Sequence, residues 1–442
     1  MSDLLAARLQ MALSLGFHII FACIGMAMPF FMAVAHWRYI RTGKAVYRDL
    51  TRAWSRGVAI FFATGAVSGT VLSFELGLLW PGFMEKAGAV IGMPFSWEGS
   101  AFFLEAIALG IFLYGWDRLK PWVHWATGVV VGVSGVLSGI FVVCANAWMN
   151  SPAGFTLIDG RFENIDPFAA MFNPGWKAQV IHMLLAAFVS TGFAVAGVHA
   201  WLLRRDPRNA FHREALRIAL AFGAGAALLQ PISGDLSAKQ ASRHQPVKLA
   251  AMEAHFETQA RAPLLIGGWP DEKTGTVAYG LRVPGLLSFL AKGDIDAVVP
   301  GLEAFPREDW PSVPIVHVAF QIMVGLGSWL AALGVAALAL AKWRPSWFFH
   351  RRFLLLLALS APLGYAALEA GWVVTEVGRQ PWIIQDILRT RDALTPMPGL
   401  WIPFTLYAGV YLLLVFVVTW LMTRHIRTVK EQYPSARGED GA

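Results

Sequence analysis

The chain has 442 residues, of which 56% are hydrophobic and only 15% are charged. Soluble domains carry about 25% charged residues, so this composition excludes an ordinary soluble protein and predicts one that crosses a membrane repeatedly. The formal net charge of +7 does not indicate a nucleic-acid partner, because Lys and Arg of membrane proteins collect in cytoplasmic loops.

Nine apolar runs are long enough to cross a bilayer, which takes about 20 residues of helix. The predicted spans are 10–36, 56–80, 97–116, 122–148, 176–203, 213–232, 313–341, 353–375 and 401–423. Lys and Arg gather after the first, third, fifth and seventh spans and in the C-terminal tail. This alternation predicts an all-α integral membrane protein with its N-terminus outside and its C-terminus in the cytoplasm.

The connection between the sixth and seventh spans divides the chain into three parts. Residues 1–232 hold six predicted spans, residues 313–442 hold three spans and a cytoplasmic tail, and residues 233–312 form one long external loop. Loops of this length without regular structure are uncommon and are usually functional or disordered. No internal repeat is visible, which weighs against a transporter built from duplicated halves.

The two cysteines, Cys23 and Cys144, lie in apolar segments without a Cys-x-x-Cys pattern. The sequence therefore supports neither a covalently attached c-type heme, nor a cysteine-bound zinc, nor a disulfide framework. No small-residue cleavage site accompanies the first apolar run, so we expect no cleavable signal peptide.

Ionisable side chains inside membrane spans are costly and by default indicate function. The predicted orientation places the candidates in the outer part of the bilayer, on the side of the long loop. Together with one methionine at the same depth, they are His18, Glu75, Glu98, Glu105, His182, Met323 and Glu376. Glu98 is expected to open the third span, with Glu105 on the same face about 10 Å deeper. Agreement in depth among several helices predicts one shared site.

The residue types suggest heme and proton transfer. Imidazole and thioether groups bind low-spin heme iron, and a carboxylate or a lone histidine suits an iron that keeps one position open. Glu98 and Glu105, two turns apart, would form a proton relay from the cytoplasm. An intramembrane histidine is also often a packing residue, and we interpret His199 and His317 in that way. From the residues alone, a heme protein and an ion-coupled transporter using Glu75, Glu98 and Glu105 both remain open.

Eight stretches carry a more specific signal. In chain order they are ARLQMALSLGFH (7–18), GAVSGTVLSFELG (65–77), PFSWEGSAFFLEA (94–106), GWDRL (115–119), SGIFVVCANAWMNSPAGF (138–155), QPVKLAAMEAHFET (245–258), IMVGLG (322–327) and GWVVTEVGRQPW (371–382). Their types and order resemble subunit I of the cytochrome bd quinol oxidases over nearly the whole chain. The short external loop resembles the cyanide-insensitive branch of that family.

The resemblance implies heme ligands position by position. His182 and Met323 match the axial ligands of a low-spin heme b. His18 and Glu376 match the axial ligands of two high-spin hemes, with heme d assigned to His18 and heme b to Glu376. A third heme b in place of heme d stays open. Arg379, one turn after Glu376, is expected to pair with a heme propionate.

The resemblance also implies a catalytic surrounding for the hemes. Glu98 and Glu105 match carboxylates at the dioxygen-reducing site and in its proton path. Ser138 and Asn146 lie on a helix that contributes to that path, and Trp372 lies among the high-spin hemes.

A quinol-binding set is expected in and beside the external loop. Lys248 and Glu253 match family residues of that loop, and we add Gln245 and Asp235 to the set. Lys248 is expected to orient a quinone oxygen, with Glu253 accepting a proton. Gln321 stands where the family often has an arginine, two residues before the methionine ligand.

The expected function is quinol oxidation at the outer face, coupled to dioxygen reduction with cytoplasmic protons and without pumping. The implied cofactors are two hemes b and one heme d. The implied partners are a second, heme-free membrane subunit and a small single-helix subunit, in a bacterial inner membrane. The rival within heme proteins is a b-type cytochrome that only relays electrons.

Overall fold

The computed structural model describes residues 1–433, so that 434–442 of the predicted tail lie outside the described residues. Nine helical segments in residues 1–433 are long and apolar enough to span a membrane, which confirms the predicted number. They are α1 (Asp3–Thr42), α2 (Ala45–Leu79), α3 (Pro81–Tyr114), α4 (Pro121–Asn150), α6 (Trp176–Leu203), α7 (Ala210–His244), α10 (Val313–Trp343), α12 with α13 (Arg351–Ser360, Leu363–Val377) and α14 (Trp401–Gln432).

Several helices extend well beyond their predicted apolar spans. Helix α7 continues to His244, and α3 begins at Pro81 and continues past Pro94. The expectation that Glu98 opens the third helix is therefore wrong, because it lies inside α3. Hydropathy marks only the part of a helix that suits hydrocarbon, whereas the backbone hydrogen bonds that define the helix continue through polar residues.

The long connection between α7 and α10 carries short regular elements rather than an open loop. They are α8 (Pro246–Met252), β3 (Gln259–Ala260), β4 (Leu264–Ile266), β5 (Trp269–Asp271), β6 (Thr276–Ala278), β7 (Leu281–Val283), α9 (Leu286–Lys292) and β8 (Val298–Val299). The strands form antiparallel pairs β3–β8, β4–β7 and β5–β6. Such pairing satisfies backbone groups that the segment would otherwise bury unpaired. We call this segment, residues 245–312, the external segment, after the side of the membrane that the distribution of Lys and Arg predicts for it.

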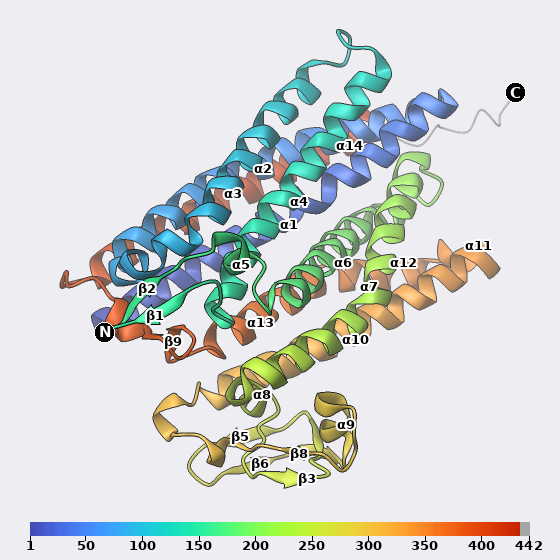
Figure 1. Ribbon diagram of the computed structural model, residues 1–442. Helices are drawn as coiled ribbons and strands as arrows, with labels where there is room; N and C mark the ends of the chain where they lie inside the picture. The colour runs from blue at the N-terminus through green and yellow to red at the C-terminus, as the bar shows by residue number, and fades with distance from the viewer. Residues whose placement is uncertain (434–442) are drawn as a thin grey trace, which may run out of the picture.

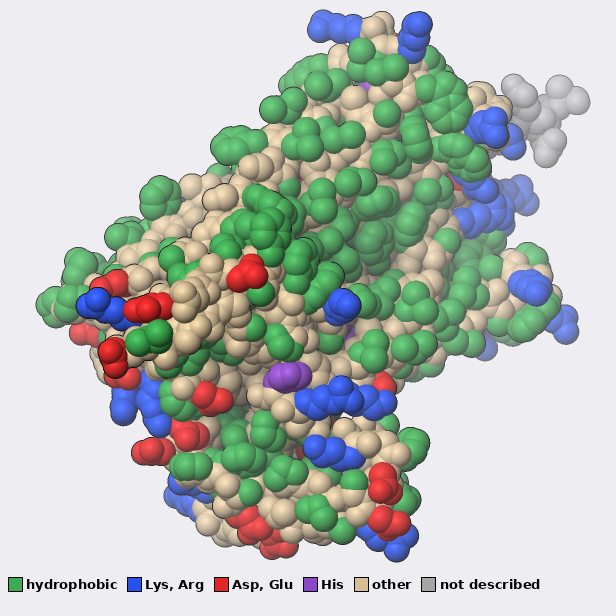
Figure 2. Space-filling model, viewed as in Figure 1, with side chains coloured by type: hydrophobic (Ala, Val, Ile, Leu, Met, Phe, Trp, Pro, Cys, Tyr) green, Lys and Arg blue, Asp and Glu red, His purple; other side chains and the backbone are tan. Residues whose placement is uncertain are grey.

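Smaller elements complete the end of the bundle that carries the external segment, which we call the loop end. They are β1 (Thr156–Ile158), β2 (Arg161–Glu163), α5 (Pro167–Met171), β9 (Trp382–Ile384) and β10 (Leu388–Arg389). The N-terminus lies at the loop end, and α14 ends at the opposite end (Figure 1). Figure 2 shows a broad hydrophobic surface over the middle of the bundle, with Lys and Arg at the end far from the external segment.

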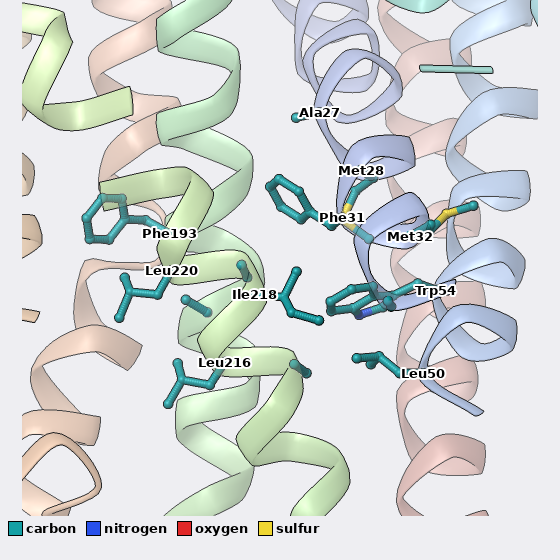
Figure 3. Packing of buried hydrophobic residues seen from close by; sticks show 14 of the residues in the cluster. Ala27, Met28, Phe31, Met32, Leu50, Trp54, Phe193, Leu216, Ile218 and Leu220 are labelled. Carbon is teal, nitrogen blue, oxygen red and sulfur yellow. The ribbon is translucent and has the colours of Figure 1, made fainter. Parts of the chain in front are cut away.

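The largest apolar core lies between α1, α2, α6 and α7. Figure 3 shows Phe31 of α1 and Trp54 of α2 facing Ile218 of α7. The rings of Phe31 and Phe222 stack at 4.7 Å. Close packing of this kind holds membrane helices together, since lipid removes most of the hydrophobic driving force. This core involves the second half of α1 and the first half of α2 and lies away from the loop end, where the ionisable side chains gather.

Candidate functional site

Glu376 lies in the last turn of α13, where two donors from different parts of the chain meet its carboxylate. One is Nδ2 of Asn146 on α4. The other is Nη2 of Arg379, 2.5 Å from Oε2. The helix ends at Val377, and the turn through Gly378 brings Arg379 back over the last turn. The structure thus brings together three predicted site residues, two of which are 230 positions apart in the chain.

Arg379 has more donors than the protein satisfies. Its side chain is only 4% exposed. Among the described residues, its Nε and Nη1 atoms are buried without a hydrogen-bond partner. A buried guanidinium needs its charge and donors matched, and a carboxylate of a bound cofactor would match them. This donor set fits the heme propionate expected for Arg379.

In each of the two histidines predicted to bind iron, a serine hydroxyl from the neighbouring helix lies beside Nδ1. The Nδ1 atom of His18 lies 3.0 Å from Oγ of Ser68 on α2. The Ser68 hydroxyl donates to the carbonyl oxygen of Thr64 at 3.0 Å, so it accepts from Nδ1–H of His18. The lone pair of this imidazole is therefore on Nε2, the tautomer that a metal-binding histidine with a fixed Nδ1–H requires.

His182 on α6 repeats this arrangement with Ser233 of α7. Its Nδ1 atom lies 2.9 Å from Oγ of Ser233, which donates to the carbonyl oxygen of Gln230 at 2.8 Å. The lone pair is again on Nε2. The amide nitrogen of Gln230 lies near both ring nitrogens, 3.3 Å from Nδ1 and 3.2 Å from Nε2.

The two histidines interpreted as structural behave differently. In His317, Nδ1 faces the carbonyl oxygen of Met252 at 2.8 Å and Nε2 faces that of Gly267 at 3.1 Å. In His199, Nε2 accepts from Trp54 and Nδ1 faces a second imidazole, His212. As in His182, both ring nitrogens lie within hydrogen-bonding distance of protein groups, but here the partners are backbone carbonyl oxygens, an indole and a second imidazole.

Met323 on α10 lies against α13 at a glycine. A Cβ atom at Gly371 would come within 3.0 Å of the Met323 sulfur. Helix α7 packs against both α6 and α10, so it joins the helices of His182 and Met323. Trp372, the residue after Gly371, packs against two apolar clusters, one containing Cys23 of α1 and the other Cys144 of α4.

The predicted proton-path carboxylates lie on α3 beside α1 and α4. Ser138 of α4 donates to Oε1 of Glu98 at 3.1 Å. Glu105 is 6% exposed, and its carboxylate lies between two glycines of the neighbouring helices, Gly25 and Gly135. A Cβ at Gly135 would come within 3.3 Å of Glu105 Oε1. The structure therefore gives Glu105 its room by using small residues on α1 and α4.

Lys248 of α8 is buried against the bundle. Its Nζ atom donates to Oδ1 of Asn150 at 2.7 Å and to Oε1 of Gln245 at 3.0 Å. Burial, with repulsion from Arg379, lowers the pKa of Lys248 to about 7. Its stem passes close over the turn after α13, where a Cβ at Gly378 would lie 3.1 Å from Lys248 Cγ. A cavity of about 160 Å³ opens beside Lys248 and Arg379, with Gln245 and Trp382 in its lining.

The rest of the expected quinol set is dispersed. Glu253 is five residues after Lys248 and hence on another face of the helical turn; its Oε2 is buried without a partner among the described residues. Burial raises the pKa of Glu253 to about 8. Asp235 pairs with Lys239 on α7 at 2.6 Å, whereas Lys248 donates to Asn150 and Gln245.

Gln321 has a role that the sequence did not suggest. Its side chain accepts from the backbone N–H of Gly267 at 2.9 Å and donates to the carbonyl oxygen of Leu265 at 3.0 Å. Gln321 therefore links the β4 region of the external segment to α10 by hydrogen bonds. His317, one turn earlier on α10, bonds to the same segment.

Asn150, Ser68 and Ser233 are functional candidates that sequence reasoning missed. Asn150 is four residues after Asn146 on α4, so their shared face was a usable signal. The serines carried no such signal, because serine occurs in many membrane helices and only the folded structure shows which histidine it contacts.

The chain is similar to known proteins over nearly its whole length. Residues 6–430 match the family described as cytochrome bd terminal oxidase subunit I. The chain is 35% identical to a putative cytochrome bd menaquinol oxidase subunit I of Bacillus subtilis (strain 168), over 97% of each chain. It is 31% identical to cytochrome bd-II ubiquinol oxidase subunit 1 of Escherichia coli (strain K12), over 95% of this chain and 96% of the relative. The solved bd oxidase from Geobacillus thermodenitrificans is similar with 37% identity and a TM-score of 0.92, over 97% of this chain and 99% of that chain.

Proposed function

The chain belongs to the cytochrome bd terminal oxidase subunit I family, and from this premise we propose that it is the heme-bearing subunit of a membrane quinol:dioxygen oxidoreductase. Quinol oxidase activity follows from the family, whose similar members are named menaquinol and ubiquinol oxidases. The observation that carries the finer proposal is the ligand geometry. In both histidines a serine hydroxyl lies within hydrogen-bonding distance of Nδ1, which supports Nε2 as the iron-binding nitrogen, and Arg379 presents two donors unmatched among the described residues.

Three hemes are assigned to these residues. His182 and Met323 hold a low-spin heme b, and His18 and Glu376 hold two high-spin hemes, with Arg379 on a propionate. When bound, the hemes supply electron transfer and an iron that binds dioxygen. We assign heme d to His18 and heme b to Glu376. The protein contributes the ligands, their orientation and access for protons.

Quinol is proposed to bind at the cavity beside Lys248, on the outer side of the membrane. Lys248 is the donor for a quinone oxygen, and Gln245 shares its hydrogen-bond network. Glu253 takes a proton from quinol, since it is a buried carboxylate whose raised pKa lets it bind a proton near neutrality. Asp235 stays a weaker member of this set, because its partner is Lys239.

Protons for dioxygen reduction are proposed to enter from the cytoplasm through Glu105 and then Glu98, with Ser138 bonded to Glu98. Quinol protons leave on the outer side. Charge therefore crosses the membrane without a pump. A second, heme-free membrane subunit and a small single-helix subunit complete the proposed enzyme.

A reduced-minus-oxidised absorption spectrum of the purified complex, with and without carbon monoxide, tests this function. We expect low-spin and high-spin heme signals, of which only the high-spin signals respond to carbon monoxide. A protein with low-spin heme alone would be an electron-relaying b-type cytochrome. A colourless protein would instead favour an ion-coupled transporter.

Glu105→Gln is expected to slow quinol-driven dioxygen consumption by about 100-fold, because glutamine cannot carry a proton. The heme spectrum is expected to stay close to that of the wild type, since the amide fits the space between Gly25 and Gly135. Oxygen uptake and heme content measured on one preparation check this. Glu105→Asp serves as the matched variant and should recover part of the rate. Wild-type turnover in Glu105→Gln would contradict the proton-path role.

The dependence of kcat/KM for quinol on pH should be bell-shaped. Lys248 must be protonated to donate, and its donor form is lost as pH rises through its pKa of about 7. Glu253 must be ionised to accept, and its acceptor form is lost as pH falls through its pKa of about 8. The maximum therefore lies between these two values. Lys248→Met should flatten the alkaline limb and Glu253→Gln the acid limb, so an unchanged profile in both variants would exclude these roles.

A further inference from the structure

An unbroken series of hydrogen bonds joins the external segment to the Glu376 carboxylate. Lys248 donates to Oδ1 of Asn150 at 2.7 Å, and Nδ2 of Asn150 lies 3.1 Å from Oδ1 of Asn146. The amide of Asn146 donates in turn to Oε1 of Glu376. We call these four residues, Lys248, Asn150, Asn146 and Glu376, the amide bridge. It joins α8, α4 and α13, three elements that have no such link through their backbones.

The direction of every bond in the amide bridge is fixed. The Lys248 ammonium has donors and no acceptor, and Gln245 also donates to Oδ1 of Asn150, at 3.0 Å. Two donors on one atom leave a single orientation for the Asn150 amide, with its NH₂ group toward Asn146. A flipped amide would set its NH₂ group against both donors.

The orientation of the Asn150 amide also fixes that of the Asn146 amide. Asn150 Nδ2 donates to both the backbone carbonyl oxygen and the side-chain Oδ1 of Asn146, at 2.9 and 3.1 Å. Because Oδ1 of Asn146 is thus an acceptor, its NH₂ group must face Glu376. All donors therefore point from the Lys248 ammonium toward the Glu376 carboxylate.

Burial makes this arrangement rigid. Asn150 is 0% exposed and Lys248 is 6% exposed. Water cannot readily replace a lost partner in such surroundings, and hydrogen bonds in series polarise one another. Within this series, Asn150 makes hydrogen bonds both to the loop side (Lys248, Gln245) and to the bundle side (Asn146).

We propose that Asn150 is a positioning residue that couples the quinol-side lysine to the heme ligand Glu376. When quinol or quinone accepts a hydrogen bond from Lys248, the ammonium bonds less strongly to Asn150. The hydrogen bonds that follow in the series, up to the one on Glu376, then weaken. The electron density that the Glu376 carboxylate offers its heme changes as a result. By linkage, the redox state of that heme changes the affinity at Lys248 by the same factor. This inference rests on the proposed function, with quinol at Lys248 and heme at Glu376.

Asn150 has two roles in the bridge, accepting from Lys248 and donating to Asn146, and Asn150→Asp removes only the second. The aspartate still accepts from Lys248 and Gln245 but has no NH₂ group for Asn146. Its charge holds the Lys248 ammonium more tightly, so quinone binding should weaken, and to the same affinity in both redox states of the heme. Asn150→Leu removes both roles and should weaken quinone binding by about tenfold, the effect of one lost charged hydrogen bond. Ser134→Ala serves as a control, because this buried α4 side chain donates only to Val130 of its own helix.

The measurement is the affinity of duroquinone for the complex with the Glu376-bound heme oxidised and then reduced, followed through the absorption of that heme. In wild type and Ser134→Ala the two affinities should differ by at least about fivefold. In Asn150→Asp the ratio should fall to about one while heme content is retained. A wild-type ratio in Asn150→Asp overturns the proposal, and so does a ratio of one in the wild type.

The failure of the proposed function would look different. If Lys248→Met bound duroquinone as the wild type does, the quinol site assigned to Lys248 would be wrong. If Glu376→Gln kept every heme signal, the ligand assignment would be wrong. With both assignments upheld, an intact ratio in Asn150→Asp would count against the coupling alone.

Discussion

Replacing Glu376 by glutamine is expected to remove one high-spin heme signal and to lower quinol-driven dioxygen reduction by about 100-fold or more. Residues that merely support a metal ligand typically contribute about 10- to 100-fold, and Glu376 is assigned as the ligand itself. The amide is a poorer donor to iron than a carboxylate. It also leaves Arg379, 4% exposed, without its carboxylate partner.

This second effect makes the variant less stable as well as less active. Breaking a fully buried ion pair by removing one partner costs about 3–5 kcal/mol, and the cost here should be smaller because Glu376 is 26% exposed. Thermal unfolding of the complex should therefore show a lower midpoint for Glu376→Gln. Heme extraction, the reduced spectrum and oxygen uptake, measured side by side, check the prediction.

Glu308→Gln is the matched control for Glu376→Gln. Glu308 also faces an arginine, Arg389, at the loop end, but its side chain is 75% exposed. Exposed ion pairs contribute little, so heme content and activity should be unchanged. Full heme occupancy and normal turnover in Glu376→Gln would rule out its assignment as a ligand.

Met323→Leu is expected to produce the second large effect, on the low-spin heme. Leucine has nearly the volume of methionine, so the packing cost should stay below about 1.5 kcal/mol. The thioether is lost, however, and with it the ligand that raises the potential of a histidine–methionine heme. Quinol oxidation should fall by about 100-fold, since ligand loss exceeds the usual effect of its supporting shell.

Two further signals distinguish ligand loss from poor folding. The heme bound by His182 should become high-spin and should begin to bind carbon monoxide, because one axial position is open. A redox titration should place its midpoint potential below that of the wild type. Met171→Leu is the control, a methionine only 2% exposed on α5, for which all heme signals should persist. An unchanged low-spin spectrum in Met323→Leu would exclude Met323 as a ligand.

The number of spans and their order followed from the sequence, but their ends did not. Hydropathy locates the part of each helix that suits lipid, so the prediction missed the polar continuation of α7 to His244 and the start of α3 at Pro81. The orientation of the bundle stays a prediction from the distribution of Lys and Arg.

Residue types and depth identified much of the candidate site before any contact was known. His18, His182, Glu105 and Glu376 stood out because charge or imidazole inside a span is costly. Their partners did not stand out. Ser68 and Ser233 determine which histidine nitrogen is available, yet serine is unremarkable in a membrane helix. Lys248 and Glu253 looked like one pair in the sequence, whereas the turn of α8 directs them to different surroundings.

The sequence by itself determined that nine segments within residues 1–433 are apolar enough to cross a membrane, which residues are too polar to be there without a reason, and which family the motifs resemble. These are local properties, read along a single segment. Only the tertiary structure decided that Lys248 reaches Asn150, 98 positions away, and that Asn146 reaches Glu376, 230 positions away. Helical periodicity tells which residues share a face, but the packing of α4 against the loop end decides which groups that face meets.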